Sequence, residues 1–186
     1  MFKKVLVFLV IGTLSCQAQE QNTAVSVEKS VFGIQTGLVG FWANNELRLA
    51  NQWALRTEIG TELYTATNTN DDHELLLVPV ISAEPKWYYN LNKRDRKGKN
   101  IKGNSGNAFS VKVQYNPNFI FAGEDFVPKP HHLALIPKWG IRRVYWEHFT
   151  FETALGIGPV FYLNNDNLYK QSEIFTDLTV RIGYSF

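Results

Sequence analysis

Long segments of this chain alternate between apolar and polar residues with a period of two. In residues 55–63 every odd position is Leu, Thr or Ile, and every even position is Arg, Glu or Gly. The same alternation recurs in residues 109–116, 133–142, 149–157 and 174–186. Successive side chains of a β-strand point to opposite faces, whereas a helical face repeats about every 3.6 residues. The pattern therefore predicts an all-β, antiparallel fold whose strands have one apolar face and one charged face.

A soluble β-sandwich alternates in the same way, so alternation alone does not decide whether the apolar face meets lipid or a protein core. The segments exceed the about five or six residues of an average soluble strand, and suffice for the roughly 9–11 tilted residues that cross a bilayer. Aromatic residues collect near segment ends, where the interfacial girdles of a membrane barrel lie. These aromatics are Trp53, Trp87, Tyr88, Tyr89, Phe119, Phe121, Tyr145, Trp146, Phe161 and Tyr162. We therefore expect an up-and-down transmembrane β-barrel with lipid outside and charges inside.

The first residues have the pattern of a secretory signal peptide. Lys3 and Lys4 precede the apolar run 5–11, and small or polar residues follow through Ala18. The run is shorter than the about 20 apolar residues that a membrane helix needs. We expect cleavage after Ala18. The predicted divisions are a signal peptide at 1–18, a periplasmic N-terminal segment at 19–30 and a barrel domain at 31–186.

Cys16 leaves one alternative open at this end of the chain. Ser15 and Cys16 form half of a lipobox, so acylation of Cys16 would be a second route to a membrane anchor. Thr13 stands where such motifs usually have Leu, and cleavage after Ala18 is the favoured prediction. The mature chain would then contain no cysteine and could form no disulfide.

The last eight residues, 179–186, alternate and end on an aromatic residue. They resemble the terminal strand through which outer-membrane barrels are recognised by the barrel-assembly machinery. The residues that carry this assembly signal are Val180, Ile182, Tyr184 and Phe186. Together with the signal peptide, this strand predicts export to the outer membrane of a double-membraned bacterium, with outer-membrane lipids and the assembly machinery as partners.

Bacterial single-chain barrels have an even number of strands and both termini in the periplasm. Counting back from Phe186 predicts eight strands if residues 31–50 supply two of them, with a turn between Gly37 and Asn45. One long strand there would give seven instead. The predicted outer loops are 164–167, 122–131 and 68–72, and the predicted periplasmic connections are 147–148, 92–107 and 51–52.

Eight strands enclose an interior that side chains fill, so no continuous water channel is expected. The predicted inward acids are Glu58, Glu62, Glu84, Glu152 and Asp177. The predicted inward bases are Arg56, Lys86, Lys112, Lys138, Arg142 and Arg181. Buried charges persist when they are paired and hydrogen-bonded, so this nearly balanced set predicts a salt-bridged plug. A catalytic carboxylate pair, such as Glu58 with Glu152, is the less favoured interpretation.

The four histidines are further candidates for acid–base or metal chemistry. His73, His131, His132 and His148 all fall in predicted loops or turns. A lipid-modifying hydrolase would need a Ser within hydrogen-bond reach of one of them, and His148 has only Thr150 at a suitable spacing. His131 and His132 lie near Glu124 and Asp125, a donor set that suits zinc or copper, but adjacent histidines of an extended chain point in opposite directions. We expect no catalytic, cofactor or metal site.

A basic run occupies residues 93–102 and holds six cations and one acid. It has too few aromatic residues to read nucleic acid, and the net charge of +2 gives no wider basic footprint. A flexible, solvated connector is the favoured interpretation. The alternative is an electrostatic anchor to anionic headgroups of the inner leaflet.

The whole chain after residue 18 resembles small outer-membrane proteins grouped as a β-barrel-domain family, many of them without an assigned activity. The resemblance is carried by residues 84–94, 103–107 and 139–143. It implies fold and location and no functional residues. We expect a monomeric, non-enzymatic barrel with a role in envelope integrity or surface binding. A hydrolase or acyltransferase at the membrane face, and more weakly a narrow passive pore, remain alternatives.

Overall fold

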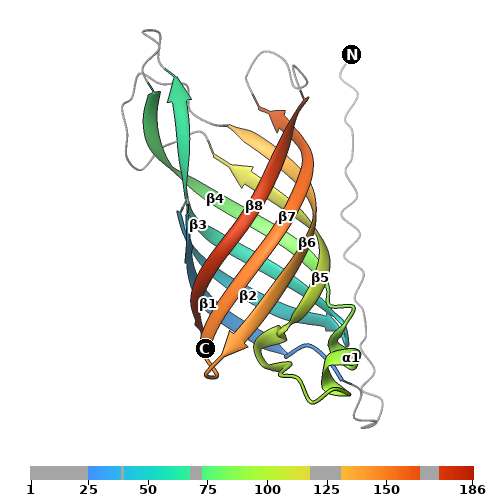
Figure 1. Ribbon diagram of the computed structural model, residues 1–186. Coiled ribbons are helices and arrows are strands. Elements are labelled where there is room, and N and C mark those ends of the chain that lie inside the picture. The colour runs from blue at the N-terminus through green and yellow to red at the C-terminus, as the bar shows by residue number, and fades with distance from the viewer. Residues whose placement is uncertain (1–24, 39, 68–72, 118–130, 164–171) are drawn as a thin grey trace, which may run out of the picture.

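The computed structural model describes residues 25–38, 40–67, 73–117, 131–163 and 172–186. Eight antiparallel strands follow one another around a closed barrel, so the predicted fold class is confirmed (Figure 1). The strands are β1 (Ser30–Gly37), β2 (Gly40–Ala50), β3 (Trp53–Thr67), β4 (His73–Trp87), β5 (Gly106–Asn116), β6 (His132–Tyr145), β7 (Phe149–Tyr162) and β8 (Ser172–Ser185). Residues 31–50 therefore divide between two strands. No helix in the described ranges has the length and apolar character needed to span a membrane.

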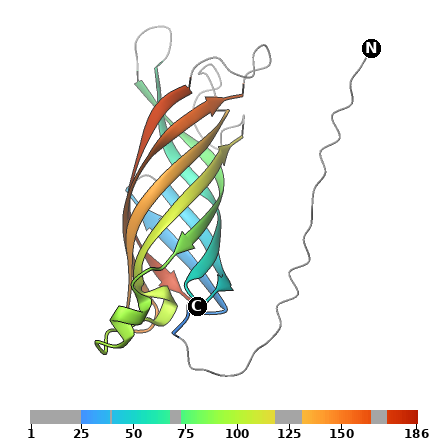
Figure 2. The same ribbon diagram turned by 90° about the vertical axis from the view of Figure 1, so that its right-hand side faces the viewer.

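The two ends of the barrel differ. One end carries the C-terminus, the start of β1, the helix α1 (Leu91–Asp95) and the turns at 51–52 and 146–148 (Figures 1 and 2). We call it the α1 end and the opposite one the distal end. The predicted connections at 51–52 and 147–148 are turns, and the β1–β2 turn falls within the predicted range. The predicted outer loops 68–72 and 164–167, and all of 122–131 except His131, lie outside the described residues.

The strand alternation sorts apolar side chains outward and charged side chains inward. Ile59, Leu155 and Leu178 are each more than half exposed on the outer face, whereas the neighbouring Glu58 and Asp177 are buried inside. This arrangement is the reverse of a soluble protein, which buries its apolar side chains. The outer surface is thus a continuous apolar band around an ionic interior.

Aromatic rings pack against one another around the outside of the α1 end. Trp53 and Trp87 stack with their ring centroids 6.1 Å apart, and Tyr89 lies 5.3 Å from Phe109. Tyr88 was predicted to belong to this ring, and that prediction is wrong. Its side chain is fully buried, because it lies on the same inward face as Lys86 and Glu84, two and four residues earlier.

A folded cap closes the α1 end. Residues 88–105 contain α1 and a 3₁₀ turn (Lys102–Asn104), and they pack with the segment that precedes β1. Val27, Leu91 and Tyr88 form an apolar cluster with almost no exposed surface. The Asn104 side chain accepts from the Glu28 backbone N–H at 2.9 Å, and the Glu28 carboxylate accepts from the backbone N–H of residue 103 at 2.6 Å. The run 93–102 was predicted to be a flexible, solvated connector: its exposure is confirmed, but it includes part of α1 and is held in the folded cap.

The hairpins are unequal in height. β3 and β4 pair along their whole length, up to Thr67 and His73. β2 pairs with β3 only as far as Gly40 opposite Glu62, and β1 pairs with β8 only through residues 33–37. The wall is consequently lower at the β1–β2 hairpin than on either side of it (Figure 1).

Candidate functional site

The inward side chains at the middle of the barrel form a dense ion cluster, which we define as Glu46, Arg56, Glu58, Lys86, Arg142, Glu152 and Arg181. Glu152 of β7 lies at its centre. Its carboxylate accepts from Arg56 at 2.6 Å, from Lys86 at 2.8 Å and from Arg142 at 3.2 Å. Each of these side chains is less than one tenth exposed. One carboxylate thus ties together β3, β4, β6 and β7.

Arg56 is the cationic counterpart of Glu152. Its guanidinium donates to Glu46 at 3.4 Å and to Glu58 at 2.7 Å, and it also donates to the side-chain oxygen of Gln35. Arg181 of β8 supplies a second cation to Glu58 at 2.6 Å. Buried charges are stable only when their hydrogen-bonding capacity is met, and this geometry meets it.

Strand register places charges of opposite sign on neighbouring strands, and closure of the barrel then brings Arg56 and Lys86 to Glu152 across the interior. Arg56 lies opposite Glu46 on β2 and opposite Glu84 on β4. Glu152 lies opposite Arg142 on β6 and opposite Arg181 on β8. Directly opposed side chains on one face of a sheet are close neighbours, and opposite charges there stabilise the pairing.

A smaller ion group lies nearer the distal end. Asp177 of β8 binds the ammonium groups of Lys112 and Lys138, each at 2.9 Å. The Thr179 hydroxyl accepts from Lys138 and donates to Asp177, both at 2.8 Å. This group joins β5, β6 and β8 across the interior.

All the predicted inward charges lie inside the barrel, but two of them are held differently. Glu62 accepts a hydrogen bond from Gln114 at 3.0 Å, and Glu84 accepts one from the Ser110 hydroxyl. Neither forms an ion pair with another residue in the described part of the chain. They are hydrogen-bonded carboxylates and do not belong to the salt-bridged core.

Sequence reasoning missed Glu46, which has no exposed surface. It accepts from Arg56, Lys86, Tyr88 and Asn104. Its addition raises the five predicted inward acids to six, equal to the six predicted inward bases. The sequence signal for an inward Glu46 was its alternation with Trp42 and Asn44. These residues could not be assigned to a face until the two strands within 31–50 were separated.

Tyr88 joins the cap to the ion cluster. Its phenol donates to Glu46 at 2.8 Å. Burial, and secondly the nearby Glu46 carboxylate, raise the pKa of Tyr88 well above its ordinary value. The phenol therefore remains a neutral donor across the whole range of physiological pH.

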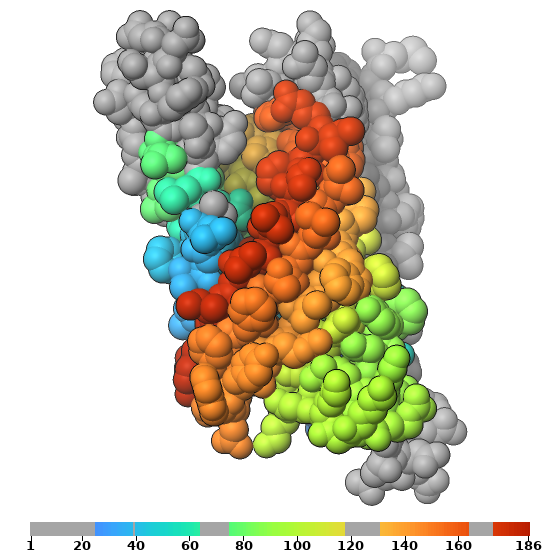
Figure 3. Space-filling model, in the orientation of Figure 1, coloured from blue at the N-terminus to red at the C-terminus, as the bar shows by residue number. Residues whose placement is uncertain are grey.

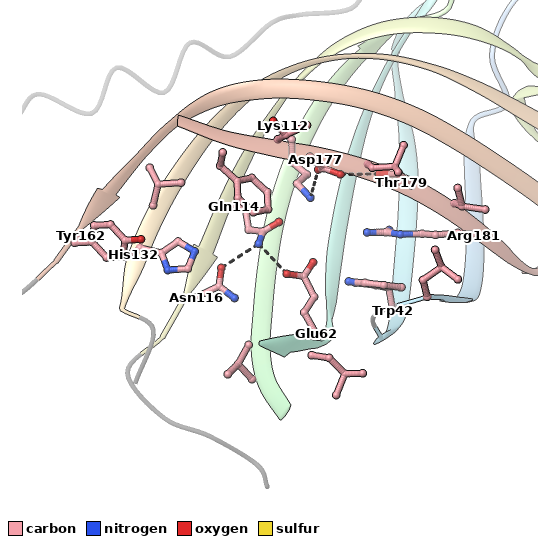
Figure 4. Close-up of a pocket in the computed structure, with 18 residues that line it drawn as sticks. Trp42, Glu62, Lys112, Gln114, Asn116, His132, Tyr162, Asp177, Thr179 and Arg181 are labelled. Carbon is pink, nitrogen blue, oxygen red and sulfur yellow. Dashed lines mark hydrogen bonds and ion pairs between the residues drawn. The ribbon is translucent and has the colours of Figure 1, made fainter. Parts of the chain in front are cut away.

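A chamber of about 460 Å³ lies beside the smaller ion group, toward the distal end (Figure 4). Its polar lining includes Trp42, Lys112 and Gln114, and its apolar lining includes Val78 and Val160. The volume is within the about 300–1,000 Å³ typical of small-molecule sites. The interior is thus filled with paired charged side chains at its middle and contains an open chamber on the distal side of them.

The histidines form no nucleophile–base pair among the described residues. His148 Nδ1 lies 2.8 Å from the backbone oxygen of Ser185, and the Ser185 hydroxyl donates to the backbone oxygen of His148. His131 contacts the Tyr115 hydroxyl at 3.4 Å. The His132 ring packs against Tyr162, with ring centroids 5.8 Å apart.

The metal and hydrolase alternatives gain no support from the described histidine geometry. No cluster of three or more His, Cys, Asp or Glu side chains that could hold a metal occurs in the described ranges. Glu124, Asp125 and the side chain of His73 lie outside these ranges. No described Ser or Thr hydroxyl is hydrogen-bonded to the ring of His131, His132 or His148.

Comparisons of the chain with protein-family models, curated proteins and solved structures find no match. The resemblance of residues 84–94, 103–107 and 139–143 to small outer-membrane barrels therefore stays a prediction. Function has to be argued from three features of the molecule itself: the apolar exterior, the ion-filled middle and the distal chamber.

Proposed function

We propose that the protein is an exported outer-membrane β-barrel with a non-enzymatic role in the envelope, and that it does not conduct ions. The ion cluster centred on Glu152 carries this proposal. Its acids and bases occupy the cross-section and are paired with one another, so an ion would have to displace a buried salt bridge in order to pass. The cap on the α1 end adds a second barrier.

The apolar exterior supports the location. Side chains such as Ile34, Ile59 and Ile157 are more than half exposed around the barrel, and contiguous apolar surface of this extent marks a membrane or protein interface. An apolar band bordered by aromatic rings is the pattern of outer-membrane barrels. The signal peptide at 1–18 and the terminal strand give the export route, with the assembly machinery as the proposed partner.

This proposal predicts two results for the protein purified from bacterial membranes. Urea washing should leave it in the membrane, and the unboiled protein should migrate differently from the boiled chain on a gel, because closed barrels resist detergent. In planar bilayers it should give no single-channel steps. Regular conductance steps would instead establish the passive-pore alternative, and release by urea would reject the location.

The basic run 93–102 lies on the outer surface of the cap, and its cations predict a preference for anionic lipid. Lys93, Arg96, Lys97, Lys99 and Lys102 are exposed and Arg94 is partly buried. Cations near an anionic surface contribute about 1 kcal/mol each at low salt. We expect phosphatidylglycerol to be enriched in the lipid that is extracted together with the protein, and replacement of the six cations by Gln to abolish the enrichment.

A matched control replaces Lys29 and Arg48, which are exposed cations outside the run. Their change to Gln should leave the lipid composition unaltered, and about 1 M salt should remove the enrichment from the unmodified protein. Equal phosphatidylglycerol content in all variants would show that the run has no anchoring role.

A further inference from the structure

The barrel wall has a gap on its distal half. Beyond the tip of the β1–β2 hairpin, residues 172–180 of β8 have no strand partner on the β1 side among the described residues. Residues 63–67 of β3 likewise have none on the β2 side. Figure 3 shows the hollow between β8 (red) and the β3–β4 hairpin (teal and green), beyond the blue β1–β2 hairpin. Unpaired backbone at membrane depth is tolerated where it is buried in protein or lines a water-filled cavity, so the chamber behind the gap is expected to contain water when no ligand is bound.

The chamber lies behind this gap and shares its edges. Leu63, Leu178 and Val180 contribute to the chamber lining and are also exposed on the outer face. Val78 and Val160 continue the apolar surface on the inner side of the wall, where both are buried. An apolar path therefore leads from the outside of the barrel into its interior.

Three polar atoms at the chamber have no hydrogen-bond partner among the residues that the structure describes: Trp42 Nε1, Gln114 Oε1 and His132 Nδ1. The Trp42 and Gln114 residues are each 3% exposed. The Gln114 amide has a fixed orientation, because its nitrogen donates to Glu62 and to Asn116, both at 3.0 Å. Figure 4 shows these groups around one space. Buried polar groups are nearly always satisfied, so an unmet donor and an unmet acceptor in the lining of one chamber indicate an absent partner.

Each charged group of the chamber already has a partner: the Glu62 carboxylate accepts a hydrogen bond from the Gln114 amide at 3.0 Å, and the two cations are ion-paired. Lys112 is paired with Asp177 at 2.9 Å, and Arg181 is paired with Glu58 at 2.6 Å while its guanidinium stacks 3.7 Å above the Trp42 ring. What is missing is a neutral group that both accepts from an indole N–H and donates to an amide oxygen. A hydroxyl does both.

We propose that the chamber binds a single-chain amphiphile with an uncharged, hydroxyl-bearing head, of the monoacylglycerol class, which enters sideways from the bilayer. The hydroxyls bind Trp42 and Gln114, and the acyl chain lies along Val78 and Val160 and leaves through the gap beside Leu178. This inference rests on the proposed membrane location. It adds a ligand site to a barrel that is otherwise closed.

Trp42 provides a local reporter for a test. The protein is purified from membranes into phosphatidylcholine nanodiscs, with the other four tryptophans (Trp53, Trp87, Trp139 and Trp146) replaced by Phe. A monoacylglycerol with a brominated chain is titrated in, because bromine quenches indole fluorescence on contact. We expect saturable quenching of Trp42. The methyl ester and the free acid of the same chain should bind about tenfold more weakly, because the ester has no donor for the Gln114 oxygen and the ionised acid brings an unpaired charge.

Two variants with matched changes locate the site. Val78→Phe with Val160→Phe fills the chamber and should abolish the saturable quenching, whereas Leu155→Phe with Ile157→Phe adds two phenyl rings on the outer face and should not. Quenching that never saturates, that is equal for all three probes, or that survives the filled chamber would overturn the inference. Heat-modifiable gel mobility is measured on every sample. If the mobility shift persists but the ligand does not bind, the proposed location stands and only the ligand site is rejected. If the mobility shift is absent, the location and the ligand site are rejected together.

Discussion

Replacing Glu152 by Gln is expected to destabilise the barrel by about 3–5 kcal/mol, the usual cost of breaking a buried ion pair from one side. The Glu152 carboxylate neutralises Arg56, Lys86 and Arg142, which are all buried. An amide at this position would bring two donors toward three cations. The remaining acids of the cluster are already engaged, so the excess positive charge would stay uncompensated.

Urea unfolding in lipid vesicles, followed by the heat-modifiable gel band, measures this change in the free energy of unfolding. The control is Lys102→Gln, which removes one partner of the exposed ion pair with Glu147 at the α1 end of the molecule. Exposed pairs contribute less than about 1 kcal/mol, so the control should unfold at nearly the unmodified urea concentration. Equal effects of the two substitutions would contradict the central role of Glu152.

Deleting Tyr184, Ser185 and Phe186 should reduce the assembled barrel by more than about tenfold, because the closing seam is short and each buried backbone hydrogen bond contributes. β1 and β8 share five residue pairs, whereas β3 and β4 share fifteen. The deletion removes two of the five pairs. It also removes the hydrogen bond from the Phe186 backbone N–H to the oxygen of Phe32 at 2.9 Å.

The amount of heat-modifiable protein in the membrane measures assembly, with Phe186→Trp as the control that keeps the backbone and an aromatic ring. Refolding of the deleted chain into pure lipid vesicles separates two causes. Failure there as well as in cells indicates the loss of the seam, and failure only in cells indicates the loss of recognition by the assembly machinery. Normal amounts in cells would rule out both roles for these residues.

The two halves of the interior suit different tasks. The middle of the barrel is stabilised by ion pairs such as Arg56 with Glu152, which leave no space for a ligand. Within the described ranges, the distal half has a strand edge without a partner strand and buried polar atoms without hydrogen bonds. A mobile ligand could therefore enter and leave the distal half without disturbing the ion cluster on which the fold depends.

Alternation alone determined much of this protein from its sequence. A strand has only two faces, so a period of two at residues such as 55–63 assigns every side chain to the outside or the inside, and the predicted inward charges follow. The two tight connections at 51–52 and 147–148 could also be placed, because polar or charged residues interrupt the apolar pattern there.

Which charges meet, and what the interior leaves empty, was decided by the tertiary structure. Glu46 contacts Tyr88 and Asn104 only because the cap folds under the barrel, and a local pattern does not encode contacts between distant segments. Closure of the barrel also places the short β1–β2 hairpin between the longer strands β3 and β8, which creates the gap and the chamber. Local periodicity fixes the face on which a side chain lies, whereas register, stagger and closure fix its neighbours across the barrel.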